Sequence, residues 1–465
     1  MTLSESPPNQ IIEAEKGITG ISVQGYKSLY EKSSIEIRPL TILAGANSSG
    51  KSSIMQPLLL MKQTLESTYD PGALLINGVY VKFTSANQLF SRIYESQQSE
   101  HLKITLQTSN HSIANTYTKN SQKGFDISQV DLIEDGCYLT YDYPFSEDKF
   151  IDLLINYYTF NKREDIANDL KNKNSNLVKN LDIFIERHKC FLNLQLESES
   201  YYIDYPKVGS FNLVIFDSYT KTNFYISELI NLIYLPGLRG FPERTYPTTA
   251  IGRTFPGTFE NYIASIISYW QETNNKRVQL LANYLEKLGL TSKIQATQLN
   301  DVQVEIQVGR NIKSSATDMI NIADVGIGVS QVVPILVALL VAETGQLVYI
   351  EQPELHLHPK AQIALAEILA DAAKKGVKTV IETHSELLLL AIQSLVAEEK
   401  LESNLVKLHW FTKGEDGMTR INSADLDDSG AFGDWPEDFA EISLHLENRY
   451  LTAAQKKLWQ KSHDC

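Results

Sequence analysis

The sequence predicts an α/β fold assembled from both ends of the chain, with an α+β lobe inserted between them. Residues 40–44 are an apolar run that suits a buried strand, and a glycine-rich turn and apolar residues with helical spacing follow it. Near the other end, two more apolar strands stop at Glu351 and at residues 383–385. Between about residues 97 and 231 the chain becomes rich in Asn, Lys, Tyr and Ser, and this change marks the insertion.

Composition limits the class of protein. The 465 residues are 43% hydrophobic and 21% charged, which suits a globular chain of two or three domains, or of one large core with insertions. The longest apolar run, residues 332–342, is too short to span a bilayer. Cys137, Cys190 and Cys465 lie far apart, which favours a reducing cytoplasm over a disulfide framework or a zinc site. The net charge of −14 does not suggest nucleic-acid binding.

The first elements precede the glycine-rich turn. Residues 1–16 have no basic region and no apolar core of a signal peptide, and we expect a mobile tail. Residues 17–29 predict an edge strand that ends in Gly-Tyr-Lys-Ser, and Ile35 and Ile37 alternate as a second strand.

The turn itself has the spacing of a phosphate-binding loop. Glycines let the backbone curl so that successive N–H groups point at phosphate oxygens, and the following helix start adds partial positive charge. Lys51 is expected to reach the β- and γ-phosphates, and the Ser52 hydroxyl to ligate Mg²⁺. The candidate phosphate contacts are Gly45, Asn47, Ser48, Ser49, Gly50, Lys51, Ser52 and Ser53.

The middle of the chain carries little recognisable chemistry. Beyond the lobe, residues 234–244 form a rigid irregular segment, whose Arg239 and Arg244 could meet phosphates or lie in a solvated loop. Expected strands fall near residues 102–106, 213–215, 294–297 and 302–308. One or two helices are expected somewhere between residues 149 and 188, and further helices near 259–270 and 277–288.

A glycine- and serine-containing turn at residues 324–331 opens the next apolar helix. Such a turn exposes N–H groups at the positive end of a helix and can therefore bind an anion. Gly328, Ser330 and Gln331 are its candidate site residues. Taken alone, the pattern also suits a purely structural turn.

Two later strands supply residues that a nucleotide site needs. Residues 346–351 end in Glu351, which suits a carboxylate that orients Mg²⁺ beside a phosphate loop. His384 follows the strand at residues 377–382, from where a histidine can reach a γ-phosphate. His356 and His358 could instead form a metal pair, although no third ligand has an obvious spacing.

In this order, the motifs resemble those of the ATP-binding-cassette type of ATPase, and more narrowly the SMC/RecF/OLD-like branch common in bacterial anti-phage defence. The resemblance covers residues 18–60 and 324–395, and residues 430–437 resemble a module of this branch. Its motifs are Gly-Tyr-Lys-Ser at 25–28, the phosphate loop, the turn at 324–331, Glu-x-Pro-Glu-x-His-Leu-His-Pro at 351–359 and Thr-His-Ser at 383–385.

The resemblance implies roles within one subunit. Residues 45–52 match the Walker A motif, and Glu351 matches the Walker B acid, a ligand of Mg²⁺ together with Ser52. His384 matches the switch histidine. Lys27 and Ser28 match an element near the nucleotide.

The resemblance also implies a second subunit. Residues 328–331 match the signature, which in such ATPases acts on the nucleotide of a partner, although Gly328 stands where Ser is usual and Ser330 lies two positions on. His356 and His358 fall in the loop that crosses the dimer.

Further departures concern hydrolysis. Gln352 occupies the position of the usual catalytic glutamate, and an amide has no basic site at neutral pH, so we expect slow turnover. Glu354 and His384 are the two candidates that could compensate, and Glu354 is the better base.

Two other positions differ from the family pattern or are hard to place. Tyr26 replaces the usual Phe, and Gln88 is a guess for the residue of the glutamine-contact loop.

The sequence therefore predicts a cytoplasmic ATPase that binds ATP and Mg²⁺ at the interface of a homodimer or higher homo-oligomer. By resemblance, it controls a separately encoded effector, such as a nuclease, in anti-phage defence. The expected parts are a tail (1–16), an N-terminal part of the ATPase core (17–96), the inserted lobe (97–231), a C-terminal part of the core (232–400) and a C-terminal module (401–465).

Three alternatives remain. An OLD-type nuclease would need a metal-binding acidic domain, for which residues 425–428 offer carboxylates, although only about 70 residues follow residue 395. A DNA-repair clamp would share the ATPase motifs. A transporter subunit is disfavoured because nothing in the sequence implies a membrane partner.

Overall fold

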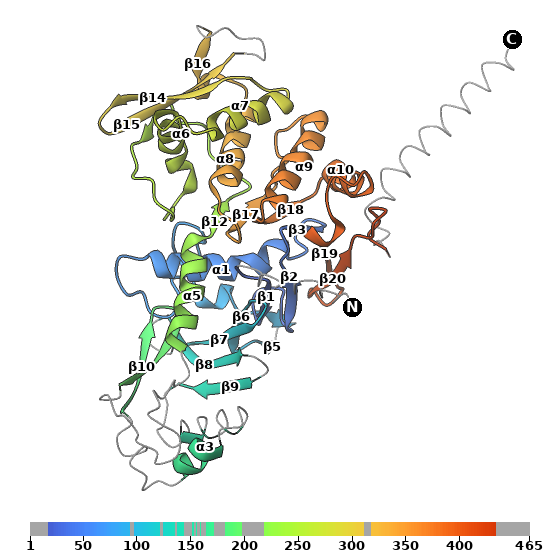
Figure 1. Cartoon of the computed structure of the whole chain (residues 1–465). Coiled ribbons are helices and arrows are strands. Elements are labelled where there is room, and N and C mark those ends of the chain that lie inside the picture. The colour runs from blue at the N-terminus through green and yellow to red at the C-terminus, as the bar shows by residue number, and fades with distance from the viewer. Residues whose placement is uncertain are drawn as a thin grey trace, which may run out of the picture.

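Both ends of the chain contribute to one six-stranded sheet, in the order β12-β17-β18-β3-β19-β20 (Figure 1). The computed structural model describes residues 17–93, 97–120, 124–134, 137–143, 151–152, 155, 159, 164–171, 182–197, 218–310 and 318–433. Strand β3 is parallel to its neighbours β18 and β19, and the edge strand β20 is antiparallel to β19. The strands are β3 (Leu40–Gly45), β12 (Ile233–Leu235), β17 (Leu347–Glu351), β18 (Lys378–Thr383), β19 (Val406–Lys413) and β20 (Thr419–Asp425).

The side chains of these strands point alternately to the two faces of the sheet, and each face packs against its own hydrophobic core. On β3, Leu40 and Ile42 pack on one face of the sheet and Leu43 on the other, because successive side chains of a strand point to opposite faces. Helices α8 (Ile327–Val341), α9 (Pro359–Lys374) and α10 (Glu386–Ala397) cover the first face, and α1 (Lys51–Glu66) covers the second. The predicted α/β fold built from both chain ends is confirmed by this sheet and its helices.

Helix α1 lies between the central sheet and a second six-stranded sheet, in the order β2-β1-β6-β7-β8-β9 (Figure 1). Strand β1 pairs with β6, so this sheet runs across the expected boundary at residue 97. The division of the chain into parts therefore stays a prediction. The strands are β1 (Gly20–Gln24), β2 (Ser33–Glu36), β6 (His101–Gln107), β7 (His111–Lys119), β8 (Phe125–Glu134) and β9 (Cys137–Asp142).

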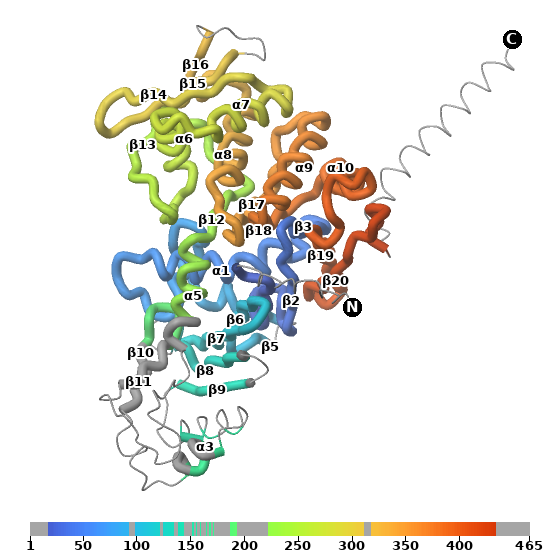
Figure 2. Tube along the Cα trace, in the orientation of Figure 1, coloured from blue at the N-terminus to red at the C-terminus, as the bar shows by residue number. Residues whose placement is uncertain are grey.

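The inserted lobe continues beyond β9, and α5 (Ser218–Asn231) returns the chain alongside α1 (Figure 2). The expected strand near 213–215, the tail at 1–16 and residues 434–465 lie outside the described residues. The other elements of this part are β4 (Arg92–Ile93), β5 (Gln97–Gln98), α3 (Glu164–Lys171), β10 (Asp182–His188) and β11 (Phe191–Glu197).

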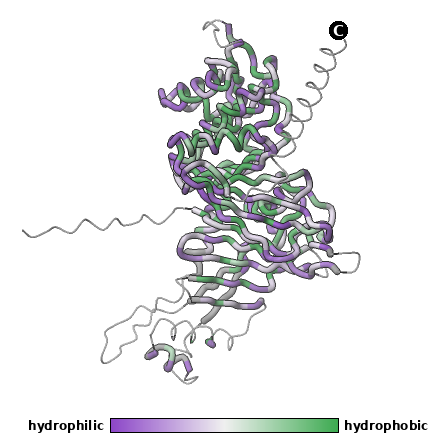
Figure 3. The backbone as a smooth tube through the Cα atoms, turned by 90° about the vertical axis from the view of Figure 1, so that its right-hand side faces the viewer, coloured by the Kyte–Doolittle hydropathy of each residue, from purple (hydrophilic) through white to green (hydrophobic). Residues whose placement is uncertain are grey.

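A smaller sheet and two helices lie at the far end of the molecule from the inserted lobe (Figure 1). Hydrophobic and hydrophilic positions alternate along the helices and strands (Figure 3). Within the described ranges, no helix is long and apolar enough to cross a membrane. The elements are β13 (Tyr246–Pro247), α6 (Ile263–Glu272), α7 (Arg277–Lys287), β14 (Ile294–Asn300), β15 (Gln303–Gly309) and β16 (Met319–Asn321).

Candidate functional site

The predicted phosphate loop connects β3 to α1 at the carboxyl edge of the central sheet. Gly45 and Gly50 have φ values of +140° and +100°. A Cβ at Gly50 would lie 2.2 Å from Thr419 Oγ1, and one at Gly45 would lie 2.2 Å from the carbonyl oxygen of Phe411. Both positions therefore need glycine, because of the backbone conformation and because of the close approach of neighbouring strands.

Lys51 folds back over its own loop. Its Nζ donates hydrogen bonds to the carbonyl oxygens of Gly45 (2.9 Å) and Ala46 (2.8 Å). Burial lowers the Lys51 pKa, and the charges of Glu382 and Glu354 oppose this shift. The loop crest at residues 46–48, which includes Asn47 and Ser48, is exposed, whereas Lys51 is buried.

Ser52 meets a carboxylate that the sequence interpretation did not select. Its Oγ donates a hydrogen bond to Glu382 Oε2 at 2.9 Å. Glu382 lies on β18, next to β3, and is buried. Burial, and next the charge of Glu351, raise the Glu382 pKa to about 7. The available signal was an acid directly after the apolar pair Val380 and Ile381, at the end of the strand expected at residues 377–382.

Glu351 lies beside Glu382, because the two residues are paired in the parallel β17–β18 ladder. Its Oε1 accepts hydrogen bonds from Tyr234 (3.0 Å) and Tyr349 (3.2 Å), and its Oε2 accepts one from the Gly237 N–H (3.1 Å). The Tyr349 hydroxyl also lies within hydrogen-bonding distance of Glu382. The two carboxylates thus form a linked pair, in which Glu382 is the member that contacts Ser52.

This set of oxygens suits Mg²⁺. The ion prefers oxygen ligands, and proteins usually hold it through one or two carboxylates and the phosphates of a bound substrate. Ser52 with Glu382, and Glu351 behind them, supply such a set beside the phosphate loop. No group of three or more His, Cys, Asp or Glu side chains that could hold a metal occurs among the described residues.

Glu354 and His384 also reach this edge of the sheet. The Thr383 hydroxyl (2.8 Å) and the backbone N–H of His384 (3.0 Å) donate to Glu354 Oε1. Burial, and then the charge of Lys51, lower the pKa of the His384 ring, which hydrogen-bonds to the backbone of Gly45. The charges of Glu354 and Lys51 influence each other, and so do those of Lys51 and His384, so all three residues belong to one site. Gln352 is held by its backbone, because its N–H donates a hydrogen bond to the Glu382 carbonyl at 2.8 Å.

The candidate signature residues point into their own subunit. Ser330 is buried, and its Oγ donates to the Ile327 carbonyl at 3.0 Å. Gln331 is buried, and its amide donates to the carbonyls of Arg239 (3.0 Å) and Gly240 (3.1 Å). Ile327 at the start of α8 is 41% exposed, so the accessible part of this turn precedes Ser330. Gly328 lies close to the 352–358 loop, because a Cβ there would be 3.3 Å from the His356 carbonyl oxygen.

The two arginines of the segment at residues 234–244 have other partners than the phosphate loop. Arg239 is buried, and its guanidinium donates to the carbonyls of Pro236, Glu351 and Gln352 at 3.1–3.2 Å. Arg244 forms an exposed ion pair with Asp324 at 2.7 Å. Arg239 therefore braces the end of β17 from behind.

Ser28 reaches the phosphate loop indirectly. Its Oγ lies 2.7 Å from Thr419 Oγ1, which also lies 2.7 Å from the Ser49 carbonyl. Lys27 Nζ instead donates to Gln56 of α1 at 2.5 Å.

Three further candidate residues are Ser49 and Ser53 of the phosphate loop and Gln88, the guess for the glutamine-contact loop. Ser49 Oγ is buried and has no hydrogen-bond partner among the described residues. Ser53 at the helix start is buried, and its N–H donates to the Gly50 carbonyl at 2.9 Å. Gln88 accepts hydrogen bonds from the N–H groups of Thr84 and Ser85 and so closes a local turn.

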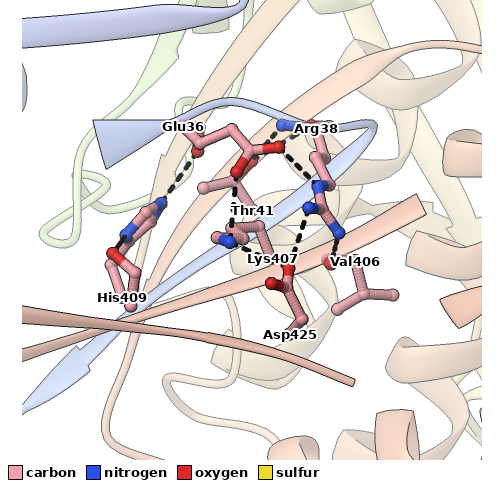
Figure 4. A network of polar contacts seen from close by, with 8 residues as sticks. Glu36, Arg38, Thr41, Val406, Lys407, His409 and Asp425 are labelled. Atoms are coloured by element: carbon pink, nitrogen blue, oxygen red, sulfur yellow. Dashed lines mark hydrogen bonds and ion pairs between the residues drawn. The ribbon is translucent and has the colours of Figure 1, made fainter. Parts of the chain in front are cut away.

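The acids at residues 425–428 have structural partners. Asp425 forms ion pairs with Arg38 and Lys407, both at 2.8 Å (Figure 4). Asp427 Oδ1 accepts hydrogen bonds from the N–H groups of Ser429 and Ala431, both at 2.9 Å. These contacts fasten the β19–β20 hairpin and the loop after it.

A family model described as an AAA ATPase domain matches residues 17–389. No curated protein shows significant sequence similarity.

Several solved SMC head domains are similar in fold. One is from Thermotoga maritima, with 10% identity, a TM-score of 0.39, and 87% of this chain and 98% of that chain covered. Another, from Pyrococcus furiosus, was solved bound to the C-terminal domain of ScpA and has 11% identity, a TM-score of 0.44, and coverage of 88% and 96%. A third, from Pyrococcus yayanosii, has 10% identity, a TM-score of 0.42, and coverage of 89% and 98%.

Proposed function

The chain belongs to the AAA ATPase domain family, and we propose that it binds ATP with Mg²⁺ at the carboxyl edge of its central sheet. The observation that carries this proposal is the contact of Ser52 with Glu382 directly after a glycine-rich loop. The contact brings a hydroxyl and a carboxylate together at the start of a helix whose first residue is a buried lysine. These groups are the complement of a Mg²⁺-bound triphosphate.

Each group of the site has a distinct role. Backbone N–H groups of residues 45–50 face phosphate oxygens, and the N-terminus of α1 adds partial positive charge. Lys51 exchanges its two carbonyl contacts for the β- and γ-phosphates. Ser52 and Glu382 would hold Mg²⁺, with Glu351 behind them, and the bound ion would neutralise charge on the phosphates.

We propose that the protein hydrolyses ATP slowly. The residue directly after Glu351 is Gln352, and its amide can orient water but has no basic site at neutral pH. An ATPase with a weakened base keeps ATP bound for longer, so ATP can act as a ligand that holds one conformational state. This behaviour suits a protein whose nucleotide state controls another molecule.

The second subunit is proposed to complete the site with the turn before α8. No hydrogen bond or ion pair in the described part of the chain joins residues 326–331 to residues 45–53. The first N–H groups of α8 have no side-chain cap, and Ile327 beside them is exposed. A partner's ATP would satisfy these N–H groups and cover the side chain of Ile327.

We further propose that the dimer controls a separately encoded effector and works in the cytoplasm in anti-phage defence. The support for this is the resemblance of the motif set to the SMC/RecF/OLD-like branch and the small number of cysteines. Asp425 and Asp427 are engaged in structural contacts. These contacts favour a protein that controls an effector, and they disfavour a chain that is itself a nuclease.

The test is the mass of the full chain in solution by light scattering, with Mg²⁺ and either ATP, ADP or no nucleotide. We expect ATP to increase the dimer fraction and ADP to leave it low. A mass that is the same in all three conditions, with ATP bound, would contradict the shared site.

A further inference from the structure

Gln352 is held in place by its backbone, and its amide side chain offers no basic oxygen. Its backbone has a φ of +45°, a left-handed value that non-glycine residues rarely adopt. Its N–H donates to the Glu382 carbonyl, and its own carbonyl accepts from Arg239 at 3.2 Å. Its side-chain oxygen lies beside Gly237, 3.5 Å from the position that a Cβ would take there. The site therefore has to obtain a base from somewhere else if it hydrolyses ATP.

The turn that follows brings a carboxylate back. Oε1 of Glu354 is fixed by two donors, the Thr383 hydroxyl at 2.8 Å and the His384 N–H at 3.0 Å. Oε2 of Glu354 is buried and has no hydrogen-bond partner within the described ranges. A buried carboxylate oxygen without a partner is costly in a folded protein, so it calls for an explanation.

The carboxylate of Glu354 lies at the end of β18, where Thr383 is paired with Ala44 just before the phosphate loop. Its negative charge acts on Lys51, the residue that we expect to hold the γ-phosphate. The same carboxylate is bound to the backbone of His384, whose ring hydrogen-bonds to the backbone of Gly45 in the phosphate loop. Glu354 is thus attached to the strand end that faces the transferred phosphate.

We propose that Glu354 Oε2 is the general base for the slow ATP hydrolysis proposed above, in place of the residue at position 352. This inference rests on the proposed ATP site. The attacking water donates a hydrogen bond to Oε2, and its oxygen forms a bond to the γ-phosphorus. The bond from the γ-phosphorus to the β–γ bridging oxygen breaks, and the electron pair leaves with ADP. The water proton passes to Glu354, which returns it to solvent or to the released phosphate.

The hydrogen bonds of Glu354 orient its carboxylate so that one oxygen can accept a proton from water. Two donors on Oε1 fix the orientation of the carboxyl plane, and they leave Oε2 free to accept from water. A role limited to bracing the end of β18 would use only Oε1. The two roles can be separated, because glutamine keeps an acceptor for Thr383 and His384 and loses the basic oxygen.

The experiment compares wild type, Glu354→Gln and the matched control Thr383→Val in the full chain. Thr383→Val removes one brace from Oε1 and leaves the carboxylate in place. Single-turnover hydrolysis of labelled ATP with Mg²⁺ gives the rate, calorimetry gives the ATP affinity, and the ATP:ADP ratio of bound nucleotide gives the trapped state. Thermal unfolding checks that each variant folds, and Glu354→Ala, which also removes the basic oxygen, replaces Glu354→Gln with the same expected loss of rate if the latter does not fold.

We expect Glu354→Gln to lower the single-turnover rate about a hundredfold, as loss of a general base does. ATP affinity should stay within about threefold of wild type, and the bound nucleotide should remain ATP. Thr383→Val should lower the rate less than about fivefold.

Three results would overturn the proposal while leaving ATP binding intact. They are a Glu354→Gln rate within threefold of wild type, an equal loss in Thr383→Val, and a wild type that binds ATP without any turnover. Failure of wild type to bind ATP would instead refute the proposed function itself.

Discussion

The Ser52 hydroxyl donates a 2.9 Å hydrogen bond to the carboxylate of Glu382, and this contact joins residues 330 positions apart in the chain. It forms because β18 is the neighbour of β3 in the central sheet, so that their carboxyl ends meet. Glu351 lies one strand further away and is bound by Tyr234, Tyr349 and the Gly237 N–H. We therefore assign to Glu382 the position nearest the Mg²⁺ that ATP brings.

Glu382→Gln should reduce the effect of Mg²⁺ on ATP binding. An amide oxygen is a weaker ligand for Mg²⁺ than a carboxylate, and loss of the negative charge also favours the triphosphate. We expect affinity in EDTA to be equal to or above that of wild type, and the gain on adding Mg²⁺ to fall about tenfold. Calorimetry in both buffers measures this, with Glu286→Gln on the exposed face of α7 as the control. An unchanged Mg²⁺ effect in Glu382→Gln would assign the ion to Glu351 alone.

His409 should make the stability of the fold depend on pH. Its Nε2 donates to the Glu36 carbonyl at 2.8 Å, and its Nδ1 lies 2.7 Å from Ser423 Oγ (Figure 4). Burial is the main cause that lowers the pKa of His409, to about 4, and the positive charges of Lys407 and Arg38 add to it. The folded state therefore keeps the ring neutral at pH values where the unfolded chain protonates it.

Because the unfolded state binds the additional proton, stability is complete above about pH 6.5 and is lost as the pH falls towards 4. We expect the free energy of unfolding to drop by about 2 kcal/mol more in wild type than in His409→Gln between pH 7 and pH 5. Urea denaturation at several pH values measures this. Parallel pH curves for the two proteins would show that His409 is not responsible.

Ile327→Arg should block self-association that depends on ATP. Ile327 is partly exposed at the start of α8, where we expect the partner's nucleotide, whereas Ser330 is buried and an arginine there would disturb the fold. Light scattering with ATP and Mg²⁺ should show a monomer, and ATP affinity should stay near that of wild type. Val302→Arg, at a distant exposed turn, serves as the control. Association that persists in Ile327→Arg would place the interface elsewhere.

The isolated chain should not cleave DNA. Asp425 is held between Arg38 and Lys407, and Asp427 accepts hydrogen bonds within its own loop. Incubation of supercoiled plasmid with the pure protein and Mg²⁺ or Mn²⁺ should leave the plasmid intact, with or without ATP. Cleavage that disappears in both Asp425→Ala and Asp427→Ala would favour an OLD-type nuclease instead.

Local patterns were sufficient to predict the phosphate loop and the strands that carry the site. The spacing of Gly45, Gly50 and Lys51 is a local property of the sequence, and so are the short runs of residues that predict β3, β17 and β18. The role of each loop residue in binding stays a prediction.

Contacts that depend on the order of strands and on the path of loops could not be predicted. Glu382 meets Ser52 because β18, and not β17, is the neighbour of β3. Gln331 points inward because the segment containing Arg239 and Gly240 covers it. Glu354 returns to the site through a turn in which Gln352 has a positive φ, and no glycine in the sequence signals that turn.

The most direct test of the ATP site is the affinity of the full chain for ATP with Mg²⁺, measured by calorimetry for wild type and Lys51→Ala. Lys374→Ala, which removes an exposed lysine at the end of α9, is the control. We expect Lys51→Ala to weaken binding by about 3 kcal/mol, or roughly a hundredfold, because it removes a charge-assisted contact to the phosphates from a buried position. A folded Lys51→Ala protein that binds ATP as tightly as wild type and the control would contradict the assignment of this loop as the nucleotide site.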